Sequence, residues 1–241
     1  MSGHSKWSTI KNKKEKADNE RAKVFTKIGR EISVAVKMGG SDPATNKRLK
    51  DVILKAKANN VPNSNIDRII KKAAGDGQKN NFFNITYEGY GPEGVAVFVN
   101  ALTDNKNRTA ANVRHYFDKF GGNLGATGCV SYLFEKKGVI YLKIDKNKEE
   151  ETMEKCIGMD ALDFEFEEGV AKVTTESDKF SDFVERLKEE GYEFLSAAVE
   201  EVPGNYVEIK SEDNREKMEK LIKSFEDDED IQEIFTNYKD F

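Results

Sequence analysis

The stretch Leu162-Asp163-Phe164-Glu165-Phe166-Glu167-Glu168-Gly169-Val170 decides the fold class of this 241-residue chain. Its first half alternates apolar and acidic residues, which is the period of a strand with one buried face. Glu168-Gly169 is a turn signal, and the apolar residues resume in Val170–Thr174. The stretch therefore predicts a β-hairpin.

A strand and a helix precede this hairpin, and a helix and a strand follow it. The strand before it is Val139–Ile144, and the helix between them surrounds Cys156. The helix after the hairpin is expected to be capped by Asp178 and to end at Gly191, and Phe194–Val202 forms the last strand. The order βαββαβ is typical of a ferredoxin-like domain, so we predict one α/β sandwich over residues 136–203.

The segments on either side of residues 136–203 each contain half of a similar domain. Upstream, period-two segments around Gly89–Gly94 predict a strand pair, followed by a helix over residues 107–120 and a strand at Val130–Phe134. Downstream, the pattern predicts a strand at Tyr206–Ile209, then a helix, then a strand at Ile231–Tyr238. We predict that residues 79–135 and 204–241 form one discontinuous ferredoxin-like domain into which residues 136–203 are inserted.

The first 78 residues are expected to form a three-helix bundle. The first helix ends at Gly39-Gly40, the second is expected to start at Asp42-Pro43, and the third runs from Asn63 to Gly75. Each has an apolar stripe at three- and four-residue spacing, beginning in the first helix with Phe25, Ile28, Ile32 and Val36. The predicted fold class is therefore multi-domain α+β, with this bundle before two ferredoxin-like sandwiches.

Charge is unevenly distributed along the chain. Residues 1–75 contain 18 Lys and Arg and 7 Asp and Glu, a net charge of +11. The remaining residues contain 21 basic and 37 acidic side chains, a net charge of −16, so the overall −5 hides two opposed halves. A basic domain on an acidic protein suggests a polyanionic partner.

The N-terminal basic tract is the strongest candidate site. It has few apolar residues and cannot bury enough surface to fold by itself, so it can become ordered on a partner. Lys and Arg bind phosphates with little sequence preference, although an ordinary solvated surface is the alternative interpretation. Trp7 either stacks on an unpaired base or anchors the tract to the bundle. The candidate nucleic-acid-binding residues are Lys6, Trp7, Lys11, Lys13, Lys14, Lys16, Arg21, Lys23, Lys27 and Arg30.

The helix over residues 107–120 supplies a second candidate surface, with Arg108 and Arg114 as its proposed nucleic-acid contacts. Polar residues line one face of this helix opposite its core stripe, namely Arg108, Asn112, His115 and Lys119. The face can hold a phosphate backbone or can simply be solvated. The glycine-rich stretch 121–128 follows a helix and enters a strand, which is the wrong context for a dinucleotide fingerprint. A mobile connecting loop that can approach nucleic acid stays open as its interpretation.

Several classes of protein are disfavoured by the sequence. The two histidines, His4 and His115, belong to no nucleophile or zinc motif. Cys129 and Cys156 form no CxxC pair and fit reduced packing residues. We therefore predict no catalytic residue, no metal site, no cofactor and no small-molecule substrate. No segment has the length and apolarity of a membrane span, and the N-terminus lacks an apolar signal region, so we expect a cytoplasmic protein.

The sequence also resembles the YebC/PmpR family over essentially its whole length. The stretches that carry this resemblance are Gly3-His4-Ser5-Lys6-Trp7, Phe25-Thr26-Lys27, Arg30-Glu31-Ile32, Lys55-Ala56-Lys57-Ala58-Asn59-Asn60, Pro62, Asn65-Ile66, Tyr87-Glu88-Gly89-Tyr90-Gly91-Pro92, Asn107-Arg108-Thr109, Val113-Arg114 and Gly121-Gly122-Asn123-Leu124-Gly125. Gly29 departs from the family pattern, which favours a larger apolar residue, and Glu93 stands where glycine is commoner.

The resemblance implies a helical domain, two α/β domains and a role in controlling gene expression rather than catalysis. Members of the family are described either as probable transcriptional regulators that bind DNA or as ribosome-associated translation activators. DNA reading usually involves a recognition helix and a dimer seam, and neither is clear in this sequence. Ribosomal RNA requires only recognition of shape and phosphates. The sequence therefore leaves DNA and ribosomal RNA as candidate partners, with the ribosome itself among them.

Overall fold

A computed structural model describes residues 17–75 and 82–239. Contacts divide the chain into two compact units. The first comprises Met1–Lys23, Gly77–Glu135 and Val202–Phe241, and the second comprises Val24–Asp76 and Lys136–Glu201. Each unit is described separately below.

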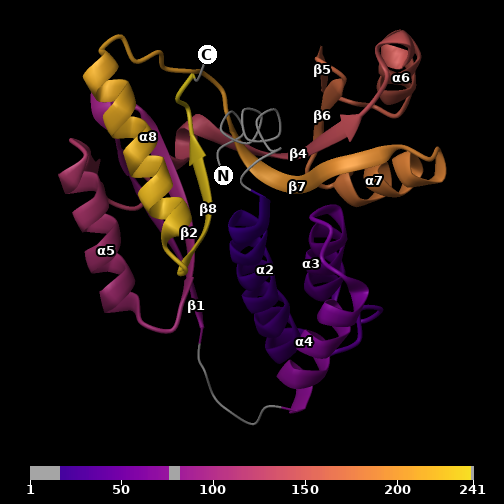
Figure 1. The fold of residues 1–241 in the computed structure, drawn as a ribbon, viewed down its shortest axis with the longest axis horizontal. Coiled ribbons are helices and arrows are strands. Elements are labelled where there is room, and N and C mark those ends of the chain that lie inside the picture. Colours follow the sequence, from indigo (N-terminus) through magenta and orange to yellow (C-terminus); the bar gives the residue numbers. More distant parts are fainter. Residues whose placement is uncertain (1–16, 76–81, 240–241) are drawn as a thin grey trace. The chain divides into compact units, whose positions relative to one another are not determined.

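The sheet of the first unit joins segments that are distant in sequence (Figure 1). Its strands are β1 (Phe83–Tyr90), β2 (Ala96–Thr103), β3 (Asn123–Leu124) and β8 (Ile231–Thr236), in the spatial order β3-β1-β2-β8. Strand β2 is antiparallel to β1 and also to β8, with Val97 opposite Thr236. This ladder supplies the pairing between upstream and downstream segments that a discontinuous domain requires.

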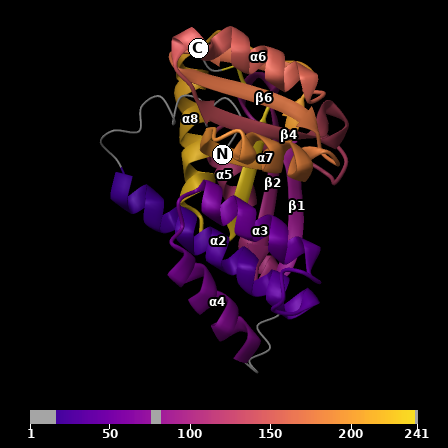
Figure 2. The ribbon, with the colours of Figure 1, turned by 90° about the vertical axis from the view of Figure 1, so that its right-hand side faces the viewer.

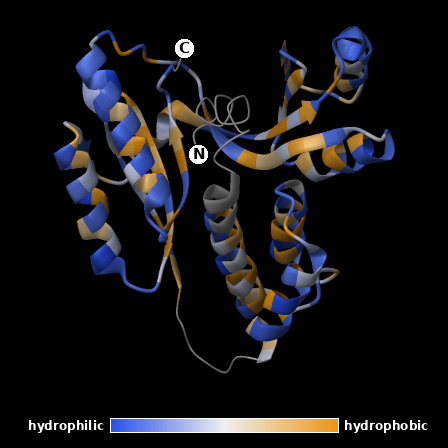
Figure 3. Ribbon diagram, in the orientation of Figure 1, coloured by the Kyte–Doolittle hydropathy of each residue, from blue (hydrophilic) through white to orange (hydrophobic). Residues whose placement is uncertain are grey.

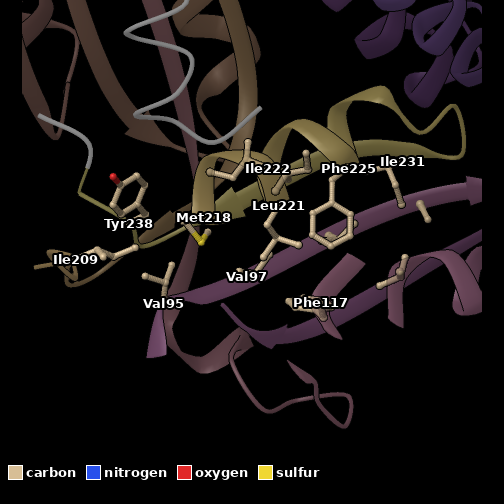
Figure 4. Close-up of a cluster of buried hydrophobic side chains, with 14 residues drawn as sticks. Val95, Val97, Phe117, Ile209, Met218, Leu221, Ile222, Phe225, Ile231 and Tyr238 are labelled. Atoms are coloured by element: carbon tan, nitrogen blue, oxygen red, sulfur yellow. The ribbon is translucent and has the colours of Figure 1, made fainter. Parts of the chain in front are cut away.

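Two helices, α5 (Lys106–Lys119) and α8 (Glu212–Asp227), pack on one face of this sheet (Figures 1 and 4). Alternate residues of β2 point into this core, and the rings of Phe117 and Phe225 meet edge to face with their centres 5.3 Å apart. In both helices hydrophobic residues alternate with hydrophilic ones, as Figure 3 shows. The other face of β2 packs through Ala96 and Phe98 on a smaller cluster that includes Val130.

Two strands predicted for the first unit are not strands in the structure. Residues Ser131–Leu133 form a short 3-10 helix, because three backbone amides in this region turn toward the Glu88 carboxylate and the chain bends around it. The predicted strand Tyr206–Ile209 is reduced to one parallel bridge between Val207 and Tyr238. The fourth strand of the sheet is instead the short β3, which pairs with β1 at the sheet edge.

The α/β part of the second unit has the predicted ferredoxin-like order. Its strands are β4 (Phe134–Lys143), β5 (Asp163–Glu167), β6 (Val170–Glu176) and β7 (Glu193–Pro203), arranged β5-β6-β4-β7. Figure 2 shows the neighbouring strands β6 and β4. The hairpin that opened the sequence argument is present, with Glu167 opposite Val170. Its helices are α6 (Glu149–Gly158) and α7 (Phe180–Glu189), and both contribute to the core around Cys156 and Leu187. Helix α7 begins after Lys179 rather than at Asp178.

The helical part of the second unit contains α2 (Ala17–Gly39), α3 (Lys47–Ala58) and α4 (Asn63–Gly75). Helix α3 starts later than predicted, because Asn46 rather than Asp42 is its N-cap. The Asn46 carboxamide accepts a hydrogen bond from Leu49 N–H at 3.0 Å and donates to the carbonyls of Ala35 and Gly40. One buried side chain thus joins the end of α2 to the start of α3.

The predicted fold class is confirmed: helices come first, and two antiparallel four-stranded sheets follow. The domain boundaries at residues 78, 135 and 203 stay a prediction. The membership of the two sheets accords with them, whereas the division into compact units places residues 24–76 together with residues 136–201.

Gly29 allows α2 and α4 to approach closely. A Cβ added at Gly29 would lie 3.2 Å from the terminal methyl of Ile69 on α4. We expect Gly29→Ala to raise the free energy of unfolding by less than about 1 kcal/mol, because alanine favours the helix and this methyl can shift. Urea unfolding followed by circular dichroism measures the change. Destabilisation would instead show that the contact between the two helices cannot adjust.

Candidate nucleic-acid interface

Six of the predicted contacts lie outside the described residues, and they are Lys6, Trp7, Lys11, Lys13, Lys14 and Lys16. The other four are on α2. For Arg21 only the helical backbone is described, Lys23 is exposed, and Lys27 and Arg30 are half-buried. The assignment of the whole tract to nucleic-acid binding stays a prediction.

Helix α4 carries a basic cluster that the sequence argument did not assign. Arg68, Lys71 and Lys72 are exposed and stand at i, i+3 and i+4, so they share one face of the helix. The opposite face buries Ile66 and Ala73 in the core of the bundle. We call Arg68, Lys71 and Lys72 the α4 cluster.

No ion pair joins the α4 cluster to an acid in the described part of the chain, although the exposed Asp67 lies one turn before Lys71 on the same helix. Among residues 17–75 and 82–239, none forms an ion pair or hydrogen bond with these three side chains. Two lysines of α8 differ from the cluster, since Lys217 pairs with Asp213 at 2.5 Å and Lys220 pairs with Glu216 at 2.7 Å. Residues 24–75 as a whole contain 11 basic and 4 acidic side chains, a net charge of +7. The cluster therefore adds directly to the positive potential of the bundle.

The sequence contained a usable signal for the α4 cluster. The apolar stripe of Ile66, Ile69, Ile70 and Ala73 defines the buried face, and the three cations fall on the remaining face at helical spacing. The net charge of residues 1–75 includes these three cations, but a total charge does not show which basic residues form ion pairs with acids.

Arg108, the predicted contact at the start of α5, is engaged within the protein. Its guanidinium donates to Asp230 Oδ2 at 2.6 Å through Nη2 and at 3.2 Å through Nε, and it also donates to Asp104 at 2.9 Å. Hydrogen bonds to Asp230 and then to Asp104 raise the pKa of Arg108. Nucleic-acid binding by Arg108 stays a prediction, and the contacts give this residue a role inside the domain.

Asp230 is the centre of that arrangement and is nearly inaccessible to solvent, with 7% of its side chain exposed. The hydroxyls of Thr103 and Thr109 donate to the same carboxylate at 3.1 and 2.9 Å. Burial raises the pKa of Asp230, but the hydrogen bonds from Arg108 and the threonines outweigh it, and the net pKa is lowered. The ionised carboxylate thus links the β2–α5 connection to the α8–β8 turn.

Arg114 is exposed on α5, and no described residue forms an ion pair or hydrogen bond with its guanidinium. It does not extend the face that Arg108 begins. The two residues are six positions apart, and at about 100° per residue they point about 120° away from each other around the helix. Lys119, at the far end of α5, lies over the Phe120 ring with its ammonium 5.3 Å from the ring centre.

The glycine-rich loop after α5 is held firmly against β1, which argues against its interpretation as a mobile connection. Glu88, a buried residue of β1, accepts hydrogen bonds from the backbone amides of Gly128, Val130 and Ser131 at 2.7, 2.9 and 2.8 Å. Burial raises the pKa of Glu88, but these amide hydrogen bonds lower it by more. We call residues 121–133, with Tyr132 near the end, the braced loop.

Other kinds of site find little support in the described residues. Cys156 is buried in the core, where burial raises the pKa of its thiol to about 11, and Cys129 is half-buried; both are free thiols. No group of three His, Cys, Asp or Glu side chains within residues 17–75 and 82–239 could hold a metal ion. None of the described helices has the length and apolarity needed to span a membrane.

Comparison with known families covers both ends of the chain. Residues 5–76 match the model described as "TACO1/YebC protein N-terminal domain", and residues 82–238 match "TACO1/YebC second and third domain". The chain belongs to the TACO1/YebC family. The resemblance seen in the sequence is confirmed.

Relatives of similar length carry a common description. A protein of Finegoldia magna is 52% identical over 238 residues, covering 99% of each chain, and one of Acetivibrio thermocellus is 53% identical over 239 residues with the same coverage. Both are called probable transcriptional regulatory protein. The crystal structure of a conserved hypothetical protein from Aquifex aeolicus matches with a TM-score of 0.85 and 43% identity, covering 97% of this chain and 96% of that one. The TACO1/YebC fold is thus known experimentally in a close relative.

Proposed function

We propose that this TACO1/YebC protein is a non-enzymatic, cytoplasmic regulator of gene expression that binds nucleic acid through its basic helical domain. The main support is the α4 cluster, in which three exposed cations share one face and form no ion pair with residues 17–75 or 82–239. The regulatory names of the relatives support the general role. The tract from Lys6 to Arg30 and the exposed Arg114 contribute further phosphate contacts in this proposal.

The proposed contact is made mainly with the phosphate backbone. Unpaired lysines and arginines displace condensed counterions from nucleic acid, which gives affinity that falls steeply with salt. Such contacts position a protein without reading sequence. The α4 cluster contains neither Asn nor Gln, the residues that pair with adenine, so sequence discrimination by this face is limited to the single Arg68.

Two physiological targets fit this contact. DNA is the first candidate, because the relatives are named as transcriptional regulators. Ribosomal RNA, bound by a ribosome-associated translation activator, is the second candidate. It is favoured by the presence of exposed basic residues on two different helices, the α4 cluster and Arg114 on α5, because folded RNA is recognised by shape and phosphates at several places.

Neutralising the α4 cluster is expected to weaken binding to any duplex. We consider the triple variant Arg68→Gln, Lys71→Gln, Lys72→Gln. The slope of log affinity against log salt concentration should become less negative by about 2 to 3, because each lost phosphate contact removes about 0.7 to 0.9 from that slope. Fluorescence anisotropy with labelled DNA and RNA duplexes between about 50 and 200 mM salt measures this slope.

The matched control is Lys217→Gln with Lys220→Gln, because these lysines are equally positive but are paired with acids on α8. The control should keep the wild-type slope. A triple variant with the wild-type slope on both duplexes would remove the α4 cluster from the interface.

The two proposed targets, DNA and ribosomal RNA, can be distinguished by sedimentation of the endogenous protein at low and high salt, with and without nuclease. Migration with ribosomes that high salt abolishes supports the RNA target. Recovery of specific promoter fragments after crosslinking, with no ribosome association, supports DNA.

A further inference from the structure

We infer that Tyr132 stacks on an unpaired nucleobase, so that the braced loop forms a second nucleic-acid contact that recognises a base rather than a phosphate. The inference rests on the proposed function, because it presumes that nucleic acid is the partner. It deepens that function by adding unpaired nucleotides to the substrate class. The position of the ring, its support and the neutrality of the loop each bear on it.

The Tyr132 side chain is displayed to solvent. With 73% of its surface exposed, it is more accessible than any other large apolar or aromatic side chain in the described part of the chain. Exposing this ring in the isolated protein has no stabilising role, since burial of aromatic surface is what contributes to folding. A bound base would cover the ring face and recover that loss.

The ring is displayed from a rigid support. Three amides around it donate to the buried Glu88 carboxylate, and the Tyr90 hydroxyl donates to the Cys129 carbonyl at 2.8 Å. Interaction with the Tyr132 side chain and burial raise the pKa of Tyr90. Because these contacts exist before binding, stacking costs little conformational entropy.

Two glycines let the braced loop lie directly on β1. A Cβ at Gly122 would lie 2.4 Å from the Tyr90 carbonyl oxygen, and one at Gly125 would lie 2.5 Å from the Cys129 sulfur. Neither position could hold a side chain without displacing the loop. The glycines that suggested a phosphate-binding loop in the sequence thus serve close packing, and the ligand-facing group is the aromatic ring at the end.

The chemistry of the loop favours a base over a phosphate. No charged residue occurs from Gly121 to Phe134, so the loop has no cationic side chain to neutralise a phosphate. An aromatic face stacks on any of the four bases, because each has a π-face. The small exposed residues Ala126, Thr127 and Gly128 leave room beside it.

A protein partner is the less suitable occupant. A specific protein interface covers about 800 Å² on each side, and the braced loop offers one exposed ring, with Leu124 and Leu133 half-buried. A stacked base needs only one ring of matching size. The observations therefore favour a nucleobase.

The test uses the full-length protein and two RNA duplexes of the same sequence, one fully paired and one with a single bulged 2-aminopurine. Wild type should bind the bulged RNA about 5- to 150-fold more tightly than the paired RNA, which is the value of one stacking contact. The fluorescence of 2-aminopurine should fall on binding. Tyr132→Ala should abolish both effects while keeping affinity for the paired RNA, and Tyr132→Phe should retain most of both.

Tyr206→Ala is the matched control, because Tyr206 is a second exposed tyrosine of the same unit and lies outside the braced loop. It should behave as wild type. If Tyr132→Ala retains the wild-type preference and quenching, or if wild type shows no preference, the inference is overturned while the proposed function stands. Wild type that binds neither RNA nor the corresponding DNA duplexes would overturn both.

Discussion

Replacing Asp230 with alanine is expected to lower the free energy of unfolding by about 2 to 4 kcal/mol, because the change removes the common acceptor of a buried polar network. The carboxylate accepts from Arg108, Thr103 and Thr109, and 7% of its side chain is exposed. In the variant the two threonine hydroxyls can still hydrogen-bond to each other, as they do at 2.8 Å in the wild type, and Arg108 can turn to solvent. The loss of stability is therefore smaller than for a buried charge that is left without any partner.

Asp104→Ala is the matched control for this prediction, because Asp104 pairs with the same guanidinium but has 52% of its side chain exposed. An exposed pair contributes little, so this variant should stay close to wild type. Urea unfolding of the three proteins measures the difference. Equal destabilisation by both variants would show that Arg108 alone, and not the buried carboxylate, holds the network.

The effect of Asp230 should depend on pH in one direction. Its pKa is lower in the folded protein than in the unfolded chain, because hydrogen bonds favour the ionised form. The stabilisation is therefore complete above the unfolded pKa of about 3.9 and is lost as pH falls through the folded value. The gap in stability between wild type and Asp230→Ala should narrow in acid, and a gap that widened would contradict this assignment.

Local patterns were sufficient for elements whose contacts are close in sequence. The alternation around Phe164 and Phe166 predicted the β5–β6 hairpin, because the paired residues are separated by a short turn. The sequence also predicted that the segments before residue 135 and after residue 204 would pair in one domain, because the later elements are too few to close a domain by themselves. The pairing of β2 with β8 joins these segments. In both cases the buried face is visible as apolar periodicity.

Polar contacts between distant segments were not predictable in the same way. Arg108 was interpreted as a phosphate ligand because its partner Asp230 is 122 positions away, and a helical wheel gives no information about such a partner. Asp42 was predicted as the cap of α3, and the actual cap, Asn46, is fixed by carbonyls of the preceding helix and turn that a local pattern does not reveal. The α4 cluster was within reach of the sequence, because its spacing is local.

Glu93 shows how a departure from a family pattern can be explained. Its backbone has φ of 54°, in the left-handed region where glycine is favoured, and this accounts for the commoner glycine at this position. The Glu93 carboxylate compensates by accepting hydrogen bonds from the amides of Lys210 and Ser211 and from the Asn214 side chain. The strained residue thereby ties the β1–β2 turn to the start of α8.

Glu88→Ala is expected to destabilise the first unit by about 3 to 5 kcal/mol. The change leaves the amides of Gly128, Val130 and Ser131 without their acceptor, and a buried amide without a partner costs about 1 to 3 kcal/mol. Glu88→Gln should lose less, because one oxygen still accepts while the new amide donors oppose the backbone donors. Thermal unfolding followed by circular dichroism measures both variants.

Glu93→Ala is the control for Glu88, since Glu93 is also a carboxylate that accepts two backbone amides, but in an exposed position where water can replace it. It should destabilise the protein far less than Glu88→Ala, and a similar loss would show that burial is not what makes Glu88 important. Glu88→Gln, the less destabilising substitution, also distinguishes the two proposed nucleic-acid contacts, the α4 cluster and Tyr132. Because it loosens the support of Tyr132 and leaves the α4 cluster untouched, it should reduce the preference for a bulged base without changing the salt dependence of duplex binding.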